Sequence, residues 1–382
     1  MTSIYLDHNA TTPLDPAVRA EVAACLDSVV GNPSSIHSLG QEARRVIDKA
    51  RARVARLIGA KPEEIVFTSG GTEANNLAIL GAVAAMKRPR PHVVTTAIEH
   101  QSVLNPCRHI EQTGGSVTFL AVDREGLLDP ASAVSSLHND TVLASIMLAN
   151  NDIGTIQSIA AMSSKTRERG ILLHTDAVQA IGKLPVDVKI LGVDLLSFSG
   201  HKLYGPQGVG ALYIRDGTTV SPLMFGGHQE RSLRPGTENV AAIAGFGKAC
   251  ELASTRLAAD AVRLNALRSL FETEILNRVR GTTVNGQGAS RLPNTSNVSF
   301  DGLDGEMLTI NLDLLGIAVS TGAACSTSEH APSHVLIAMG RTPEQARSSV
   351  RFSFGRGNTE ADVLRTVDLV AQIVETMWGG SR

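Results

Sequence analysis

The sequence contains few aromatic residues and carries only a small net charge. Phe, Trp and Tyr make up 3% of its 382 residues, so Ala, Val, Ile and Leu must fill the core. Those side chains suit helices packed against parallel strands that are buried on both faces. The formal net charge of −2 provides neither the positive field that nucleic acids attract nor a basic surface for anionic membranes. The composition therefore argues against a nucleic acid or a lipid surface as the main partner.

The sequence also has no apolar run of membrane-spanning length. The opening residues, MTSIYLDHNATTP, contain an acidic residue and a proline where a secretory signal would carry a long apolar run. A chain of 382 residues is too long for one ordinary core and long enough for two. We therefore expect a cytoplasmic protein with a large domain and a smaller one.

Cysteine is scarce, with four residues in the whole chain, which is too few for a disulfide framework. Cys25 and Cys250 lie in alanine-rich, helix-like segments and are expected to be small buried apolar residues. Cys107 follows Pro106 at the expected start of a helix. Cys325 differs, because its surroundings, STGAACSTSEHAPSH, are small and polar without a periodic apolar face. We expect this cysteine to lie in an accessible loop, which is one requirement for reactivity.

Short apolar runs alternate with helical patterns over the first part of the chain. The segment 41–58 has apolar residues at three- and four-residue spacings, which predicts an amphipathic helix. Most apolar runs are continuous, which predicts an α/β fold with a mostly parallel seven-stranded sheet and helices on both faces. The short connection before the last run predicts an antiparallel neighbour. The runs are 64–68, 92–98, 116–122, 141–148, 171–177, 194–200 and 210–214.

The last part of the chain indicates a smaller α+β domain, into which the first dozen residues cross. It predicts a helix at 255–280, a strand at 294–300, a helix at 306–315, a strand at 349–354 and a closing helix from about residue 359. The expected division is 15–258 for the large domain, and 1–14 with 259–382 for the small domain.

Three segments at the ends of predicted strands carry residues suited to holding a cofactor. In TSGGTEANN, at 68–76, Gly70 and Gly71 allow a tight turn before a helix that begins near Thr72. The N–H groups and the dipole at such a helix start bind phosphate, although a Gly-Gly pair alone more often forms only a turn. The spacing fits neither the dinucleotide-binding fingerprint nor the Walker pattern.

The other two segments follow the strands predicted at 171–177 and 194–200. Asp176 lies at a strand's carboxyl end, and a buried carboxylate there needs a cation such as a protonated pyridine nitrogen. Lys202 follows a buried strand and lies among glycines, and a desolvated lysine is a Schiff-base nucleophile. Alone, such an Asp could cap a helix and such a Lys could lie on the surface. Together, the three segments match the phosphate, the ring nitrogen and the aldehyde of pyridoxal phosphate.

Several motifs also resemble those of a known family, in the same order and over essentially the whole chain. They are YLDHNATTP (5–13), SGGTEANN (69–76), IEH (98–100), ANNDIGT (149–155), DAVQ (176–179), SGHK (199–202), ACS (324–326) and SSVRFSFGR (348–356). These motifs resemble the class V aminotransferase superfamily, specifically cysteine desulfurases of the NifS/IscS type. The resemblance implies a fold type I pyridoxal-phosphate enzyme that acts as a homodimer.

The resemblance further implies how individual residues hold the cofactor. Lys202 would bind its aldehyde as a Schiff base, Asp176 would pair with the pyridinium nitrogen, and Gln179 would hydrogen-bond the phenolic oxygen. His100 would stack on the pyridine ring and take part in proton transfer. The phosphate would be bound by Gly71, Thr72, Ser199, His201 and, from the neighbouring subunit, Thr237.

The resemblance assigns the reaction to a second set of residues. Asn151 and Arg351 would bind the substrate carboxylate, with Asn32 nearby, and a guanidinium suits that task because its planar fork matches a carboxylate. Cys325 would take sulfur from L-cysteine as a persulfide, leaving L-alanine. The segment 322–333 resembles the long mobile loop of this group, which would carry the sulfur to an acceptor protein for iron–sulfur cluster assembly or thiolation.

The chain departs from the family's commoner pattern at Asp152, Pro235 and Ala323, none of which is a proposed catalytic group. It also ends at MWGGSR without the longer tail by which housekeeping members engage a scaffold protein, so the acceptor stays open.

Other interpretations remain. Zinc ligation has little support, since neither Cys325 with His330 and His334 nor His174 with Asp176 supplies a paired ligand motif, and no metal is expected. An aminotransferase or a selenocysteine lyase on the same fold is the nearer alternative. A sulfur-delivery or interaction protein whose catalysis is incidental is a third.

Overall fold

A computed structural model describes residues 3–321 and 332–379. Its largest sheet has seven strands in the order β2-β8-β7-β6-β5-β3-β4. β8 runs antiparallel to both of its neighbours, and the other adjacent pairs are parallel. The prediction of a mostly parallel seven-stranded sheet is therefore confirmed, with the chain reversing between β7 and β8. The strands are β2 (Ile65–Thr68), β3 (His92–Thr96), β4 (Ser116–Leu120), β5 (Thr141–Ser145), β6 (Leu172–Asp176), β7 (Leu195–Ser199) and β8 (Gly210–Ile214).

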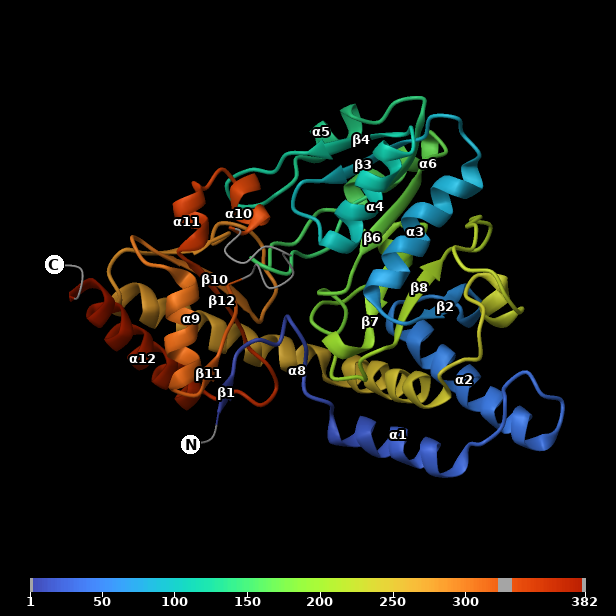
Figure 1. Cartoon of the computed structure of the whole chain (residues 1–382), viewed down its shortest axis with the longest axis horizontal. Coiled ribbons are helices and arrows are strands. Elements are labelled where there is room, and N and C mark those ends of the chain that lie inside the picture. Colours follow the sequence, from blue (N-terminus) through green and yellow to red (C-terminus); the bar gives the residue numbers. More distant parts are fainter. Residues whose placement is uncertain (1–2, 322–331, 380–382) are drawn as a thin grey trace.

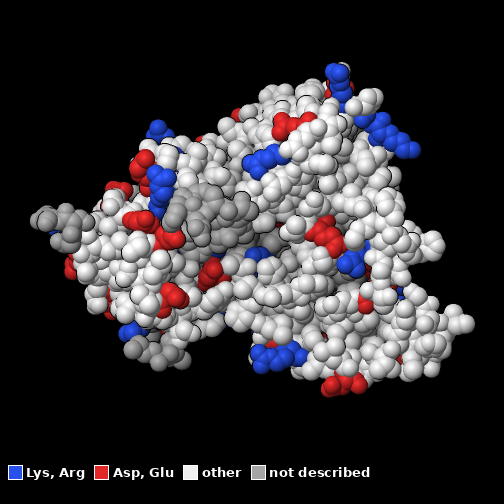
Figure 2. Space-filling model, in the orientation of Figure 1, with Lys and Arg blue, Asp and Glu red and all other residues white. Residues whose placement is uncertain are grey.

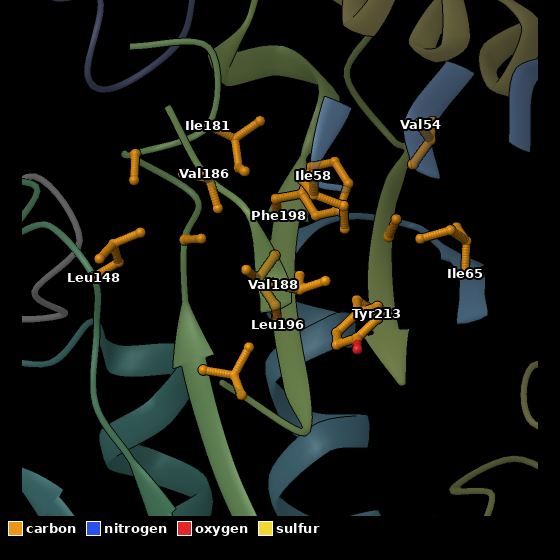
Figure 3. Packing of buried hydrophobic residues seen from close by; sticks show 14 of the residues in the cluster. Val54, Ile58, Ile65, Leu148, Ile181, Val186, Val188, Leu196, Phe198 and Tyr213 are labelled. Atoms are coloured by element: carbon orange, nitrogen blue, oxygen red, sulfur yellow. The ribbon is translucent and has the colours of Figure 1, made fainter. Parts of the chain in front are cut away.

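Helices pack on both faces of this sheet because its inner strands are apolar on both sides. Along β7, Leu196 and Phe198 face a core shared with α2, α6 and α8, whereas Leu195 faces a core shared with α3 and α4. Figure 3 shows Phe198 close to Ile58, which follows the end of α2, and Leu196 close to Val188. The helices are α2 (Ser38–Leu57), α3 (Gly71–Met86), α4 (Gln101–Gln112), α6 (Ala160–Glu168) and α8 (Val240–Arg278).

Further helices and 3-10 turns complete this part of the chain. They are α1 (Pro16–Ser28), α5 (Pro130–Ser135), α7 (Val188–Leu191) and the 3-10 turns η1 (Pro62–Glu64), η2 (Gly200–Lys202) and η3 (Gln229–Ser232). The amphipathic helix predicted at 41–58 is confirmed as α2. The expected helix start at Pro106 was wrong, because α4 begins at Gln101 and contains Pro106 in its interior. Cys25, Cys107 and Cys250 are all buried.

A second core lies to the left in Figure 1 and is built by the last part of the chain together with its first residues. It holds an antiparallel sheet of order β12-β10-β9 and a parallel pair, β1-β11. Ile4 pairs with Ile317, so the first residues join the strands of this second core. The elements are β1 (Ile4–Tyr5), β9 (Thr282–Asn285), β10 (Thr295–Phe300), α9 (Gly305–Leu314), β11 (Ile317–Ala318), α10 (His334–Ala338), α11 (Pro343–Arg347), β12 (Ser349–Ser353) and α12 (Glu360–Gly379).

One helix serves both cores. α8 is 39 residues long and runs from the large sheet toward the second core (Figure 1). Phe246 and Cys250 in its first half pack with the large sheet, whereas Phe271 and Ile275 in its second half pack in the second core. The expected boundary between residues 258 and 259 falls inside this helix and stays a prediction.

The distribution of surface charge agrees with the small net charge of the sequence. On the face drawn in Figure 2, acidic and basic side chains are interspersed. Among the described residues, no helix combines the length and the apolar character needed to cross a membrane.

Candidate functional site

A cavity of about 550 Å³ opens where the carboxyl ends of β6 and β7 meet β12 and the segment around Asn9. This volume is in the range of small-molecule sites. The cavity brings together ten residues that the sequence predicted: Gly71, Thr72, His100, Asn151, Asp176, Gln179, Ser199, His201, Lys202 and Arg351. These residues are separated by up to 280 positions, so the fold, and not local sequence, assembles them.

Lys202 is the last residue of η2, which follows β7 directly. Its Nζ donates to the carbonyl oxygen of Asn9 at 2.7 Å and to that of Ala10 at 2.5 Å. The amine is thus held at the cavity wall by the segment that crosses from the second core. The alternative of an ordinary surface lysine is excluded, since Lys202 is only partly exposed and lines the cavity.

Asp176 ends β6 and is 4% exposed. Its Oδ1 accepts from the backbone N–H of Val178 at 2.9 Å, and its Oδ2 accepts from Asn75 Nδ2 at 2.7 Å. Both donors are uncharged, so the buried carboxylate keeps a need for a cationic group on its cavity side. Asn75 Oδ1 is also buried and has no hydrogen-bond partner among the described residues. The buried carboxylate of Asp176 is therefore suited to accept a hydrogen bond from a ligand that has a positively charged N–H group.

His100 caps the start of α4 above the same cavity. Its Nδ1 accepts from the backbone N–H of Ser102 at 3.1 Å and lies 2.7 Å from Ser102 Oγ. A backbone N–H can only donate, so the ring proton is placed on Nε2. Ser102 Oγ in turn accepts from Asn75 Nδ2 at 2.8 Å. One amide side chain thereby fixes both the histidine and Asp176.

The start of α3 forms a cradle suited to a phosphate. Gly70 has a φ of 156°, which its lack of a side chain permits, and α3 begins at Gly71. A Cβ at Gly71 would lie 2.7 Å from Val178 Cγ2, so the space there depends on glycine. An adjoining hollow of about 390 Å³ is lined by Thr72, Ser199 and His201 among others. Exposed backbone N–H groups at the first turn of a 16-residue helix attract anions.

His201 lies in this cradle, and its Nδ1 is 3.1 Å from Thr11 Oγ1. Burial, together with the nearby charge of Lys202, lowers the pKa of His201 to about 4. The imidazole is therefore neutral at neutral pH when the cradle is empty of anions, and it can donate one N–H.

Arg351 reaches the cavity from β12 and is 3% exposed. Its NH1 donates to the carbonyl oxygen of Asn151 at 3.0 Å, and its NH2 donates to Asp7 Oδ1 at 2.7 Å. Its Nε has no hydrogen-bond partner among the described residues. A guanidinium in a cavity wall is suited to binding a carboxylate, because its planar fork presents several N–H donors.

Three expected site residues are not placed in the cavity. Asn32 and Thr237 lie on exposed segments and do not line it. Cys325 lies outside the described residues. The roles of these three residues stay predictions.

The described residues hold no group of three or more His, Cys, Asp or Glu side chains arranged for a metal. His174, one of the considered ligands, is occupied on both ring nitrogens by Ser145 and Ser197. Burial lowers the pKa of His174 to about 3, as expected for a structural neutral histidine.

The sequence did not identify four residues of this network: Asn9, Asn75, Ser102 and Lys183. Asn9 and Asn75 lie within motifs that were quoted for their neighbours. Lys183 follows Gln179 by four residues and donates to it at 2.6 Å. A polar residue in a buried turn, close in sequence to a residue with a predicted role, is the signal that could have identified Lys183.

The chain belongs to the class-V aminotransferase family, whose model matches residues 4–366. It is 49% identical over 374 residues to a protein named cysteine desulfurase IscS from Dictyoglomus turgidum, covering 98% of this chain and 95% of the relative. A solved NifS-like protein matches with a TM-score of 0.92 at 37% identity, covering 98% of this chain and all of that one. Another structure, described as SspA in complex with cysteine, has a TM-score of 0.83 at 35% identity, with 92% and 99% covered.

The residues present fit the cofactor of this family. Pyridoxal phosphate carries an anionic phosphate, a ring nitrogen that can be protonated, and an aldehyde. The glycine-dependent cradle at α3 suits the first, the uncharged surroundings of buried Asp176 suit the second, and Lys202 suits the third.

Proposed function

We propose that this protein is a pyridoxal-phosphate-dependent cysteine desulfurase, which converts L-cysteine to L-alanine and transfers the sulfur to Cys325 for delivery to an acceptor. The observation that carries the proposal is the meeting of Lys202, Asp176 and Arg351 at one cavity. These three side chains provide an amine, a buried carboxylate and a carboxylate-binding guanidinium. Relatives named cysteine desulfurase that match nearly the whole chain support the assignment.

In this proposal, Lys202, Asp176 and Gln179 hold the cofactor's aldehyde, ring nitrogen and phenolic oxygen. Gly71, Thr72, Ser199 and His201 hold its phosphate. When bound, pyridoxal phosphate supplies an aldehyde that condenses with amines and a ring that withdraws electrons from the substrate Cα. His100, whose proton is placed on Nε2, faces the cavity and is able to pass a proton.

The chain's own groups then bind and deprotonate the substrate. Arg351 takes the carboxylate of L-cysteine, and Asn151, whose carbonyl oxygen accepts from Arg351, keeps the guanidinium in place. Once its amine is free, Lys202 removes the proton from the substrate Cα. Lys202 and Arg351 line the same cavity, which suits a small amino acid held by both ends.

Sulfur transfer is assigned to Cys325. Its thiolate attacks the substrate sulfur, a new S–S bond forms, and the bond between Cβ and sulfur breaks. The electron pair of the broken bond stays with the carbon skeleton, which takes up protons and leaves as alanine. Cys325 keeps the sulfur as a persulfide until an acceptor thiol removes it. This role rests on the ACS motif and on the relatives, since Cys325 lies outside the described residues.

We also propose a homodimer in which Thr237 reaches the phosphate of the neighbouring subunit, and we propose that Asn32 lies near the substrate carboxylate. Both residues are exposed, and so are nearby apolar side chains: Ile36 is 95% exposed and Phe225 is 90% exposed. Burial of such side chains between two copies would be favourable. The same proposal includes a large domain at 15–258 and a small domain formed by 1–14 and 259–382. It also includes a cytoplasmic location.

Pure protein loaded with pyridoxal phosphate and mixed with L-cysteine tests the assignment. Alanine release and bound persulfide are measured for wild type and for Cys325→Ala. We expect the variant to retain the cofactor and to lose alanine release, because it has no thiol to accept sulfur. Cys25→Ala, which alters a buried helical cysteine, is the matched control and should turn over normally. Equal alanine release by Cys325→Ala would contradict the assigned sulfur acceptor.

A further inference from the structure

Arg351 already has a negatively charged partner. Its NH2 lies 2.7 Å from Asp7 Oδ1, and the side chains of Arg351 and Asp7 are 4% and 19% exposed. Arg351 is among the described residues that line the cavity, and Asp7 is not. The reaction above needs Arg351 for the carboxylate of the substrate and gives Asp7 no part. A carboxylate thus lies beside the group that has to bind another carboxylate, which calls for an explanation.

Backbone contacts fix where Asp7 lies. Asp7 pairs with Ser353 in a parallel bridge, and Ser353 follows Arg351 by two residues on β12. The flanking hydrogen bonds run from the N–H of Ser353 to the carbonyl oxygen of Leu6 at 2.7 Å, and from the N–H of His8 to that of Ser353 at 3.2 Å. Alternate residues of a strand share one face, so Asp7 is held beside the face that carries Arg351. An uncharged side chain at residue 7 should therefore keep the same place.

Asp7 contributes charge to Arg351, whereas the orientation of the guanidinium has a second source. Arg351 NH1 donates to the carbonyl oxygen of Asn151 at 3.0 Å, which is an uncharged partner. A buried guanidinium without a counter-charge is unfavourable, and Asp7 supplies that counter-charge in the empty cavity. A ligand carboxylate that binds the same guanidinium has to share it with Asp7. Two like charges so close repel each other strongly enough to change a dissociation constant by about tenfold or more.

We propose that Asp7 is a positioning residue that acts through Arg351 and lowers the affinity of the cavity for carboxylates. Because Asp7 neutralises Arg351 before a ligand arrives, a carboxylate gains less when it binds. The substrate L-cysteine and the product L-alanine carry the same carboxylate, so both are held less tightly and the product leaves the cavity more easily. The inference rests on the proposed function, because it takes these amino acids as the ligands.

Asp7→Asn tests the charge, because asparagine keeps the shape of the side chain and an oxygen that can accept from Arg351 NH2. We expect KM for L-cysteine and the inhibition constant of L-alanine both to fall about tenfold. KM for cysteamine, which lacks the carboxylate, should not change. General damage to the site would raise these constants, so the expected direction separates the effect of the charge from a structural effect.

Asp260→Asn is the matched control. Asp260 pairs with Arg356 Nε at the same 2.7 Å, the side chains of Arg356 and Asp260 are 16% and 18% exposed, and neither residue lines the cavity. This variant should leave both constants within about twofold of wild type, since its charge lies away from the ligand. An equal fall in both variants would overturn the proposal, because the effect would not depend on Arg351.

A second readout does not need the cofactor. In thermal unfolding of cofactor-free protein, Asp7→Asn should unfold at a lower temperature than wild type, because Arg351 has lost its counter-charge. Added L-alanine should raise the unfolding temperature more in the variant than in wild type, and ethylamine, which lacks the carboxylate, should raise it in neither. An equal rise with L-alanine would overturn the inference. A wild-type protein that releases no alanine from L-cysteine would instead refute the proposed function and leave this readout usable.

Further variants cover a failure of Asp7→Asn to fold and test the route through Arg351. Asp7→Ser also removes the charge and should lower the inhibition constant of L-alanine, whereas Asp7→Glu keeps the charge and should not. Combined with Arg351→Gln, Asp7→Asn should change L-alanine binding no further than Arg351→Gln alone, because Asp7 acts through Arg351. A gain in affinity that survives the loss of Arg351, or an inhibition constant that is unchanged or raised in the uncharged variants, would contradict the proposal.

Discussion

Arg351→Lys should weaken the binding of L-cysteine while leaving the cofactor in place. The guanidinium bonds Asn151 and Asp7 from two different nitrogens and retains Nε without a partner among the described residues. Lysine keeps the positive charge but has no planar fork. Losing one hydrogen bond to a charged group costs about 1.5–3 kcal/mol, and each ~1.4 kcal/mol is tenfold, so KM should rise about 10- to 100-fold.

The assay is steady-state alanine release at varied L-cysteine, with cofactor content measured by absorbance. Arg356→Lys is the control, because Arg356 also uses its guanidinium, on Asp260 and against the Tyr204 ring, away from the cavity. Cysteamine, which lacks the carboxylate, gives a second check. Wild type should discriminate strongly between cysteine and cysteamine, and Arg351→Lys should lose much of that discrimination. A KM within twofold of wild type, or unchanged discrimination, would refute the reasoning.

Two further predictions concern the phosphate cradle and the buried histidine. Gly71→Ala should weaken pyridoxal-phosphate binding by about tenfold, since the added Cβ would lie 2.7 Å from Val178 Cγ2. Equilibrium titration with the cofactor measures this change. Gly357→Ala is the control, because an added Cβ there would have nothing within 4 Å. Equal affinity in both variants would show that the cradle does not need glycine. The pKa of His174 falls from 6.5 to about 3 in the folded state because of burial, so the unfolded state takes up its proton first. The contribution of neutral His174 to the free energy of unfolding is therefore complete above about pH 6.5 and is lost as the pH falls, at about 1.4 kcal/mol per pH unit. Urea unfolding at pH 7 and pH 5 should show a smaller loss of stability in His174→Gln than in wild type.

Much of the large sheet could be predicted from the sequence because each strand carries its own evidence. The continuous apolar run around Leu195 and Phe198 predicts burial on both faces, and the structure places these two residues in separate cores. Lys202 and Asp176 could be singled out for a related reason. Strand ends of a parallel sheet meet at one edge, so a polar residue after each strand is expected near the others.

Other features depend on contacts that leave no local signal. The sequence pattern places a helix start at Pro106, yet α4 accommodates this proline in its interior. The missing N–H affects only one hydrogen bond of a helix that is packed on the sheet. Asn9 bonds Lys183 and Lys202 across more than 170 positions, which periodicity does not reveal. Thr237 is exposed in a single chain, so the described residues do not test a role that requires a second copy.

The long helix α8 packs in both of the cores that carry residues of the cavity. Lys202 belongs to the sheet on which its first half packs, and Arg351 belongs to the strands on which its second half packs. At 1.5 Å per residue, its 39 residues form a rod roughly 60 Å long. A single added residue between the two packed halves would rotate one core relative to the other by about 100°. A substitution on the exposed side of α8 should therefore be tolerated, whereas a change in its length would alter how the two cores that carry Lys202 and Arg351 pack together.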